Sequence, residues 1–522
     1  MSRNARKKPN LPTKSASQKI GILEKNQRII LFCIFVVGLI SRLPLVWNNL
    51  PPYQFCDETI YFEEVMRMIL TGDTLPNEYR AGGFNLYPAI LLIKTLNLFL
   101  PVPLSYSQNL IVGKFLYVAL LPSLSVFYVY KISRLFSVVK ISLAVSLLYS
   151  FSVFYYMQFW YPDTFIQFNI VGFLYFFLLI LNKHFQSRNF VFLGIFLAFA
   201  VSTKWTAVLL FLPLLLGIGL SLRKSTHTRK LLFGIGNFAV SFTIAFLSLN
   251  AGIILRTDKF LEGFKFNLNN YGTTEGIRFS GFSYYLSVTL WNSFGMFVMF
   301  FIVFGVIWAV KNRSTALVIL IFPLALIAVL GDKQYVVPRH MASAAPFLIP
   351  FLAIGFEQFW CSERIRRTSR ISLITFVLTL SSLSYASQVV VASQADTRTL
   401  AEEWVDKNIS NDVAVGTNEF CFGASPAQVV GRKIVSDPNM TLNLEYYVFS
   451  SFWPCPATSK YLSRGALTSL DQSKLHFEQW NSTRLFGAIN APNIVSSDFK
   501  KGYILVKTFR GNGPDIFVVQ RS

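Results

Sequence analysis

The stretch "IILFCIFVVGLISRLPLVWN" (29–48) is apolar over most of its length and contains a single charged residue, Arg42. The hydrocarbon core of a bilayer is about 30 Å thick and requires roughly 20 apolar residues in a spanning helix. We therefore expect this stretch to cross a membrane. Because it follows a basic leader and has full spanning length, we interpret it as a retained first helix and not as a cleavable signal peptide.

The composition of the whole chain is that of a polytopic membrane protein. Of its 522 residues, 53 % are hydrophobic, 16 % are aromatic and only 14 % are charged, which is too apolar for an ordinary soluble protein. The net charge is +22, but many of the Lys and Arg residues lie in short breaks between apolar runs. We interpret these cations as topology signals and expect no nucleic-acid partner. The five cysteines lack metal-ligand spacing, so a structural zinc site is not expected.

Apolar windows of spanning length recur along the chain as far as Ala392. The expected spans are 29–48, 108–130, 141–157, 164–181, 190–203, 205–221, 231–254, 284–310, 315–330, 342–360 and 371–392. The stretch 84–100 is also apolar, but Lys94 and flanking prolines favour a helix in the membrane interface. The expected fold class is an all-α polytopic membrane domain over 29–392, with about eleven transmembrane helices and a first outer loop over 49–107.

The distribution of Lys and Arg predicts the orientation of these helices. Alternate breaks carry fifteen Lys and Arg residues and a single acid, Glu363; their sequences are "KISRLFSVVK", "NKHFQSR", "RKSTHTRK", "KNRS" and "SERIRRTSR". By the positive-inside rule these breaks are cytoplasmic, together with the basic leader over 1–28. The other loops and the C-terminal region are then outside. We expect a multi-pass protein with its N-terminus inside, in the bacterial cytoplasmic membrane.

The composition changes near Ser393, where alternating apolar and polar runs replace the spanning segments. We expect a soluble extracytoplasmic domain of mixed α/β type over 393–522. It opens with a predicted helix, "TRTLAEEWVDKNI" (397–409). Cys421 and Cys455 belong to this domain, and a disulfide between them is one alternative that the sequence leaves open.

The first outer loop gathers four acids in the stretch "FCDETIYFEEV" (55–65). In a helix, Asp57, Tyr61 and Glu64 would share one face, with Glu58 beside Asp57 at the helix start. One interpretation is that these acids stabilise the start of a surface helix through its dipole. The other is that partly desolvated carboxylates at the membrane surface act as a general base or hold a divalent cation.

In order along the chain, several motifs resemble the GT-C class of polytopic glycosyltransferases, in particular the branch with protein O-mannosyltransferases and the aminoarabinose transferases of lipid A. The resemblance extends over nearly the whole chain in layout, and the Asp-Glu loop is its distinctive part. The motifs are Arg42–Leu43, Asp57–Glu58, "Y…GD…P" (Tyr61, Gly72, Asp73, Pro76), Pro88, "PD" (Pro162, Asp163), "TKW" (203–205), "RH" (339–340) before Pro346 and Pro350, and the tail "DTRTLAEEWVDKNI".

The resemblance implies a GT-C-like enzyme that moves a sugar from a polyprenyl-phosphate carrier to a hydroxyl of a lipid, glycan or protein acceptor, with membrane lipid around it. It implies inversion at the sugar, with Asp57 as general base and with Glu58 and Asp163 as further catalytic acids. The leaving phosphate needs nearby cations. The implied substrate-binding residues are Tyr61, Lys204, Arg278, Lys333, Arg339 and His340.

The same resemblance leaves the metal question open. The loop "WYPDTF" has one acid where the oligosaccharyltransferase branch has an Asp-x-Asp pair that holds a metal. We therefore predict no metal ligand and no firm cofactor, with a divalent metal as the alternative.

Each candidate also has a plainer interpretation. Asp163 can cap a helix, Lys204 can reach the interface beside Trp205, and Arg339 can contact lipid headgroups. For Arg42, Lys94 and Lys114 the expected roles are the same interfacial reach or packing against the acidic loop. The sequence also leaves two competing functions open. One is a lipid or solute transporter or flippase with an extracytoplasmic domain, and the other is a structural or assembly protein that catalyses no reaction. A transporter would be expected to bury acids near the bilayer midplane within repeated halves, which the sequence does not display.

Overall fold

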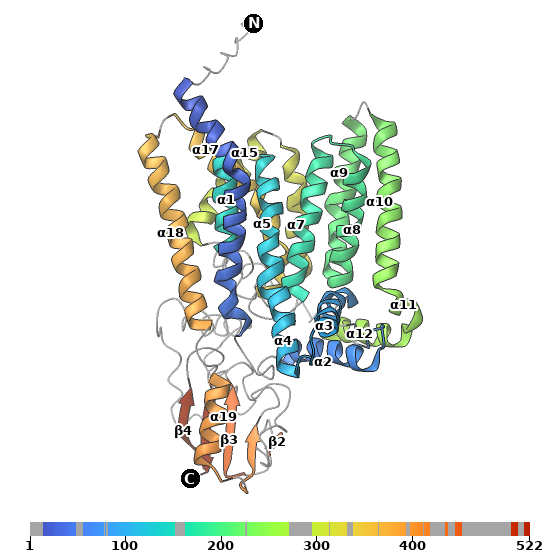
Figure 1. The fold of residues 1–522 in the computed structure, drawn as a ribbon, viewed down its shortest axis with the longest axis vertical. Coiled ribbons are helices and arrows are strands. Elements are labelled where there is room, and N and C mark those ends of the chain that lie inside the picture. The colour runs from blue at the N-terminus through green and yellow to red at the C-terminus, as the bar shows by residue number, and fades with distance from the viewer. Residues whose placement is uncertain are drawn as a thin grey trace.

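The computed structural model places a bundle of long helices above a smaller unit of strands (Figure 1). The described residues are 14–47, 56–77, 79, 82–151, 162–224, 227–270, 285, 295–312, 314–330, 338–363, 365–392, 397–410, 412–417, 434–436, 444–450, 503–509 and 516–521.

The bundle contains helices within each of the expected spans, although 152–157 of the third span and most of 284–294 of the eighth lie outside the described residues. Its elements are α1 (Lys14–Val46), α4 (Tyr106–Lys114), η3 (Phe115–Leu120), α5 (Leu121–Arg134), α6 (Val139–Phe151), α7 (Pro162–Leu181), α8 (Ser187–Thr203), η5 (Trp205–Leu210), α9 (Phe211–Lys224), α10 (Thr228–Leu249), α15 (Met296–Lys311), η7 (Thr315–Leu320), α16 (Ile321–Leu330), η8 (Pro338–Ser343), η9 (Ala345–Leu348), α17 (Ile349–Cys361) and α18 (Arg367–Ala392). The run from α4 through η3 to α5 is continuous, with η3 as a π-helical turn in its middle.

Six helical stretches among the described residues are long and apolar enough to cross a membrane. They are Asn26–Val46, Tyr106–Arg134, Pro162–Leu181, Trp205–Arg223, Thr228–Leu249 and Met341–Cys361. Shorter apolar helices cover Gly83–Phe99, Val139–Ser150, Ser187–Thr203, Phe297–Lys311 and Thr315–Leu330. The chain is therefore an integral membrane protein, while the total of about eleven spans stays a prediction.

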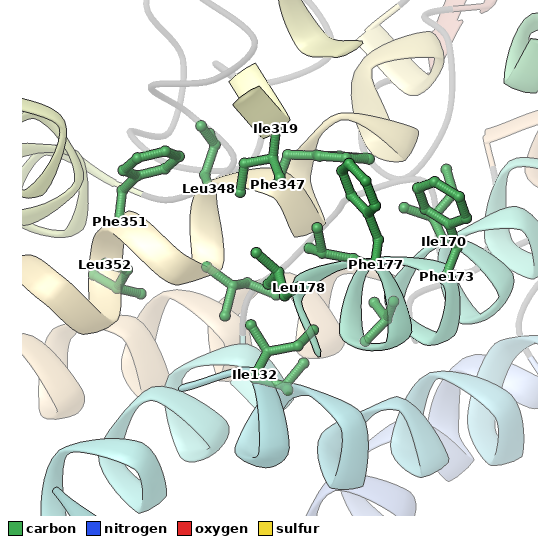
Figure 2. Close-up of a cluster of buried hydrophobic side chains, with 14 of the residues drawn as sticks. Ile132, Ile170, Phe173, Phe177, Leu178, Ile319, Phe347, Leu348, Phe351 and Leu352 are labelled. Carbon is green, nitrogen blue, oxygen red and sulfur yellow. The ribbon is translucent and has the colours of Figure 1, made fainter. Parts of the chain in front are cut away.

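α7 is the central helix of the bundle, because hydrophobic side chains surround it on several sides. Phe173, Phe177 and Leu178 of α7 are buried, and Figure 2 shows them facing residues of α5, η7, η9 and α17.

Helices α15 and α17 pack with their backbones in close contact. A Cβ atom on Gly305 would lie 1.9 Å from the carbonyl oxygen of Phe351, so only glycine allows the two backbones to approach so far.

The apolar part of α1, Asn26–Val46, matches the expected span over 29–48, although the helix itself begins at Lys14, inside the basic leader. The end of α10 differs from the sequence-based expectation. α10 ends at Leu249 and not at 254, and the short helix α11 (Ala251–Leu255) follows it. The break falls at Asn250, whose side-chain amide donates to the carbonyl of Phe246 and to the hydroxyl of Ser202. Such side-chain hydrogen bonds compete with helix continuation.

Short helices gather at the end of the bundle nearer the strands (Figure 1). They are α2 (Cys56–Thr71), η2 (Gly83–Asn85), α3 (Tyr87–Phe99), α11 and α12 (Thr257–Asn270). The last turn of α9 and the first turn of α10 lie at the opposite end of the bundle (Figure 1). We call the end that carries α2, α3 and α12 the outer end.

The strand unit contains a five-stranded sheet in the order β2-β1-β3-β5-β4. Its strands are β1 (Val415–Thr417), β2 (Ile434–Ser436), β3 (Tyr446–Ser450), β4 (Tyr503–Phe509) and β5 (Ile516–Arg521). β1 is parallel to β2 and β3, whereas β5 is antiparallel to β3 and β4. Helix α19 (Thr397–Asn408) covers the sheet through Ala401 and Val405, in agreement with the helix predicted over 397–409. Cys421 and Cys455 lie outside the described residues.

Candidate functional site at the outer end of the bundle

Helix α2 packs one apolar side against the rest of the outer end. Its Phe62, Val65 and Met68 recur at helical spacing and are fully or almost fully buried. They join a cluster, here called the outer cluster, that also includes Phe84 of η2, Tyr117 of η3 and Phe165 of α7. The ring of Phe165 lies 5.1 Å from that of Phe84 and 5.2 Å from that of Tyr117, between ring centroids. The outer cluster therefore connects α2 with the first turns of α7.

Asp57 and Glu58 occupy the first turn of α2. Carboxylates are favoured there by the helix dipole. The orientation of these two side chains lies outside what the structure describes, so their catalytic role remains a prediction. Tyr61, one turn further along α2, is half-buried and packs against the outer cluster.

Asp163 and Lys204 form an ion pair, although 41 positions separate them in the sequence. Asp163 lies in the first turn of α7 with its side chain 6 % exposed. Lys204 is the residue after α8, with an extended backbone (φ −151°, ψ 126°) and a side chain that is 17 % exposed. Two of the predicted site residues are thus brought together in a largely enclosed position, where a charge-assisted hydrogen bond is strong.

The backbone around Lys204 is fixed by contacts from three directions. The amide of Gly82 donates to the carbonyl of Thr203 over 3.1 Å. Asn169 of α7 donates to the Thr203 hydroxyl over 3.1 Å, and Asn250 donates to Ser202. On the far side, the indole of Trp205 donates to the carbonyl of Tyr79 over 3.4 Å. The first outer loop, α7 and the end of α10 therefore all determine where Lys204 lies.

The remaining predicted substrate-binding residues are described only in part. Arg339 and His340 lie on η8, which packs against α7, but their side chains are outside the described part of the structure. Arg278 and Lys333 fall in segments that the structure does not describe.

Arg42 and Lys114 are buried inside the protein and do not extend to its surface, as a reach to the membrane interface would require. Arg42 is 2 % exposed and Lys114 is 0 % exposed, so both cations are enclosed by the protein. Arg42 donates to the carbonyl of Ser150 over 3.3 Å and lies 6.0 Å from the ring centroid of Tyr385. Lys94 on α3 is exposed and fits the interfacial interpretation. Enclosed cations in a membrane domain are costly and usually belong to functional or strongly structural positions.

A network of charged groups after α2 was not predicted. Asp73 accepts hydrogen bonds from Arg67 of α2 over 2.9 Å and from Arg256 over 2.6 Å. The backbone amide of Leu75, with these two guanidinium groups, holds the pKa of Asp73 well below its usual value. Arg67 also makes two hydrogen bonds to Glu64, which raise the pKa of the guanidinium further. In the sequence, Asp73 was visible only as part of the "GD" motif.

Among the residues that the structure describes, no group of three or more His, Cys, Asp or Glu side chains is arranged to hold a metal ion. The acids Asp57 and Glu58 are not included in that observation, since their side chains are not described.

Comparison with known proteins shows the fold. No protein-family model and no curated protein sequence matches the chain. Among solved structures, it is similar to the oligosaccharyltransferase AglB from Archaeoglobus fulgidus in complex with an inhibitory peptide and a dolichol-phosphate, with a TM-score of 0.51 and 12 % identity over 87 % of this chain and 72 % of that one. It is also similar to ArnT from Cupriavidus metallidurans bound to undecaprenyl phosphate, with a TM-score of 0.50 and 13 % identity over 84 % of this chain and 94 % of that one. The GT-C-like membrane fold expected from the sequence is confirmed by these likenesses.

Proposed function

We propose that this protein is a membrane glycosyltransferase that moves a sugar from a polyprenyl-phosphate carrier to a hydroxyl-bearing acceptor at the outer end of the bundle. The observation that carries the proposal is the enclosed Asp163–Lys204 pair, located at the same end as the first turn of α2 with Asp57 and Glu58. The two similar structures, solved with dolichol-phosphate and with undecaprenyl phosphate, support this class of donor. The protein O-mannosyltransferase and aminoarabinose transferase branch remains the proposed relationship.

In the proposed reaction, Asp57 accepts the proton of the acceptor hydroxyl while that oxygen attacks the anomeric carbon. The bond between the anomeric carbon and the phosphate oxygen breaks, and the polyprenyl phosphate leaves with the electron pair. Attack from the face opposite the leaving group inverts the configuration. General-base assistance of this kind contributes about 10²- to 10⁴-fold in rate. Glu58 is proposed as the neighbouring acid that tunes Asp57.

Lys204 is proposed to stabilise the negative charge that develops on the leaving phosphate. Asp163 keeps the ammonium group in place before the donor binds, because the two groups are already paired. Arg339 and His340, with Arg278 and Lys333, are proposed as further phosphate contacts. Tyr61 is proposed to contact the sugar from the surface of α2.

The proposed orientation places the outer end and the strand unit outside the cell. The basic leader and the five Lys- and Arg-rich breaks would then face the cytoplasm, as the positive-inside rule requires. We propose the division into a leader (1–28), a transferase domain (29–392) and an extracytoplasmic domain (393–522), in a bacterial cytoplasmic membrane.

Release of polyprenyl phosphate from a polyprenyl-phosphate sugar by the purified protein tests the proposal. We expect Asp57→Asn to lower the rate by about 10²- to 10⁴-fold. The matched control is Glu63→Gln, an exposed acid on the same helix, which should keep the wild-type rate. Wild-type turnover in Asp57→Asn would contradict the role of Asp57, and translocation of lipid without bond cleavage would favour a transporter.

Two further variants test the cation. Lys204→Met should slow phosphate release strongly, whereas Lys259→Met, an exposed lysine on α12, should not. Activity that survives an excess of chelator would argue against the divalent metal.

A further inference from the structure

Asp73 joins two segments of the outer end that are distant in sequence. It accepts from Arg67 of α2 and from Arg256, which lies between α11 and α12, 183 positions further along the chain. Both guanidinium groups also donate to the carbonyl oxygen of Leu75, over 2.9 Å and 3.0 Å. Arg256 makes a further hydrogen bond to the side chain of Asn77. We call Arg67, Asp73, Leu75, Asn77 and Arg256 the outer clamp.

The outer clamp is attached to α2 by more than one bond. Glu64 accepts two hydrogen bonds from Arg67, over 2.9 Å each, and also accepts from the backbone amide of Asn77. The loop after α2 is therefore folded back onto the helix that carries Asp57 and Glu58. Movement of this loop requires movement of α2 or the loss of several charge-assisted hydrogen bonds.

On its other side, the outer clamp is continuous with the segment that holds Lys204. Arg256 immediately precedes α12, and Phe260 in the first turns of α12 contacts two aromatic rings. Its ring centroid lies 6.1 Å from that of Tyr79 and 5.6 Å from that of Trp205, both edge to face. Trp205 follows Lys204 directly and donates to the carbonyl of Tyr79. Contacts therefore run without a gap from α2 through Asp73 and Arg256 to the Lys204 backbone.

The charge balance of the outer clamp depends on Asp73. The side chains of Arg67, Arg256 and Asp73 are 26 %, 27 % and 24 % exposed, so they are partly withdrawn from water. Without the Asp73 carboxylate, the guanidinium groups of Arg67 and Arg256 would both bind the Leu75 carbonyl oxygen with no anion between them. Like charges held so close together repel each other. Arg67 would keep its bonds to Glu64, but Arg256 would lose its ionic link to the loop.

We propose that Asp73 and Arg256 are positioning residues for sugar transfer: they set α2, with Asp57 and Glu58, at a fixed distance from the Asp163–Lys204 pair. This inference rests on the proposed function. Neither residue needs to touch the substrate. A displacement of about 1 Å between a base and the reacting centre can lower a rate by about 100-fold, so a positional role is sufficient to affect turnover strongly.

The geometric part of the proposal is tested without any substrate. Spin labels are placed at Leu70 on α2 and Glu262 on α12, whose side chains are exposed, in a variant whose five cysteines are replaced by serine. We expect a single narrow distance distribution with intact Asp73, and a broader or longer one in Asp73→Asn. Asp258→Asn is the matched control, because it removes a carboxylate from the exposed first turn of the same helix. It should leave the distance unchanged.

The functional part is tested by measuring the steady-state rate at which polyprenyl phosphate is released from the donor. Asp73→Asn should lower kcat by about 10- to 100-fold with less than a threefold change in the KM for the donor, because the substrate-binding groups remain. Arg256→Lys keeps the charge but not the fork of donors, and its kcat should lie between those of the wild type and Asp73→Asn. An unchanged label distance in Asp73→Asn, or an altered distance with wild-type kcat, would overturn the proposal. A wild-type protein that never releases phosphate overturns the proposed function instead, while the distance measurement still decides on the outer clamp.

Discussion

Replacing Gly82 by alanine should separate the first outer loop from the backbone that carries Lys204. A Cβ atom at this position would lie 1.9 Å from the carbonyl oxygen of Ser202 and 2.9 Å from the amide nitrogen of Thr203. These are backbone atoms of α8, so they cannot turn away as a flexible side chain can. Since non-bonded atoms rest about 3.5 Å apart, the loop must retreat by about 1.5 Å.

The magnitude follows from two losses. Overpacking of this kind costs about 1–3 kcal/mol of folding stability. The hydrogen bond from the Gly82 amide to Thr203 is lost as well, which adds about 1 kcal/mol. We therefore expect Gly82→Ala to be destabilised by about 2–4 kcal/mol. If the protein still folds, its rate of polyprenyl phosphate release should fall by about 100-fold, because the first outer loop is displaced relative to Lys204.

Thermal unfolding in detergent and phosphate release measure the two effects separately. The matched control is Gly236→Ala on α10, where an added Cβ meets nothing within 4 Å. That variant should melt at the wild-type temperature or slightly above it, since alanine is favoured over glycine in a helix by roughly 0.5–1 kcal/mol. A Gly82→Ala protein that melts and turns over like the wild type would refute the reasoning.

Other variants test single contacts. Tyr79→Phe should cost no stability, because the buried Tyr79 hydroxyl has no hydrogen-bond partner among the described residues. Tyr117→Phe should cost about 1 kcal/mol in thermal unfolding, since its hydroxyl donates to a buried carbonyl of η2. Gly252→Ala should be destabilising, because the new Cβ would lie 1.7 Å from the Tyr79 hydroxyl oxygen, and Tyr79→Phe should relieve part of that loss. The pKa of Asp73 is lowered, so its contribution to stability is present above the unfolded-state value of about 3.9 and is lost only as the pH falls through the lower folded-state value. The label distance across the outer clamp should therefore stay constant from about pH 9 to pH 5 and lengthen only in stronger acid.

Sequence reasoning located the helices well because a bilayer imposes a length and a composition on every span. The end of α10 was predicted at the wrong residue, because the helix ends at a side chain whose hydrogen-bond partner is far away in the sequence. Asn250 breaks the helix with help from Ser202, 48 positions away, and no helical periodicity reveals that partner.

The sequence predicted which residues could belong to the candidate site, but not which of them form ion pairs with each other. The sequence placed Asp163 and Lys204 on the same side of the membrane, but their mutual ion pair depends on how α7 and α8 pack. Arg256 was overlooked because a single arginine in a loop carries no pattern. Its role can be inferred only from the folded structure, in which it forms an ion pair with Asp73.

The strand order has a consequence for biosynthesis. Among the described strands, β5 alone lies between β3 and β4, and it follows β1 by about 100 positions in the sequence. The sheet can therefore be completed only late in synthesis, through contacts between distant parts of the chain. The helices of the bundle leave the ribosome well before β5 does. Of the five described strands, β2, β1 and β3 must therefore remain unpaired along one edge of β3 until β5 is translated. A translation pause or a cleavage just before Ile516 would leave that edge open to pairing with another nascent chain.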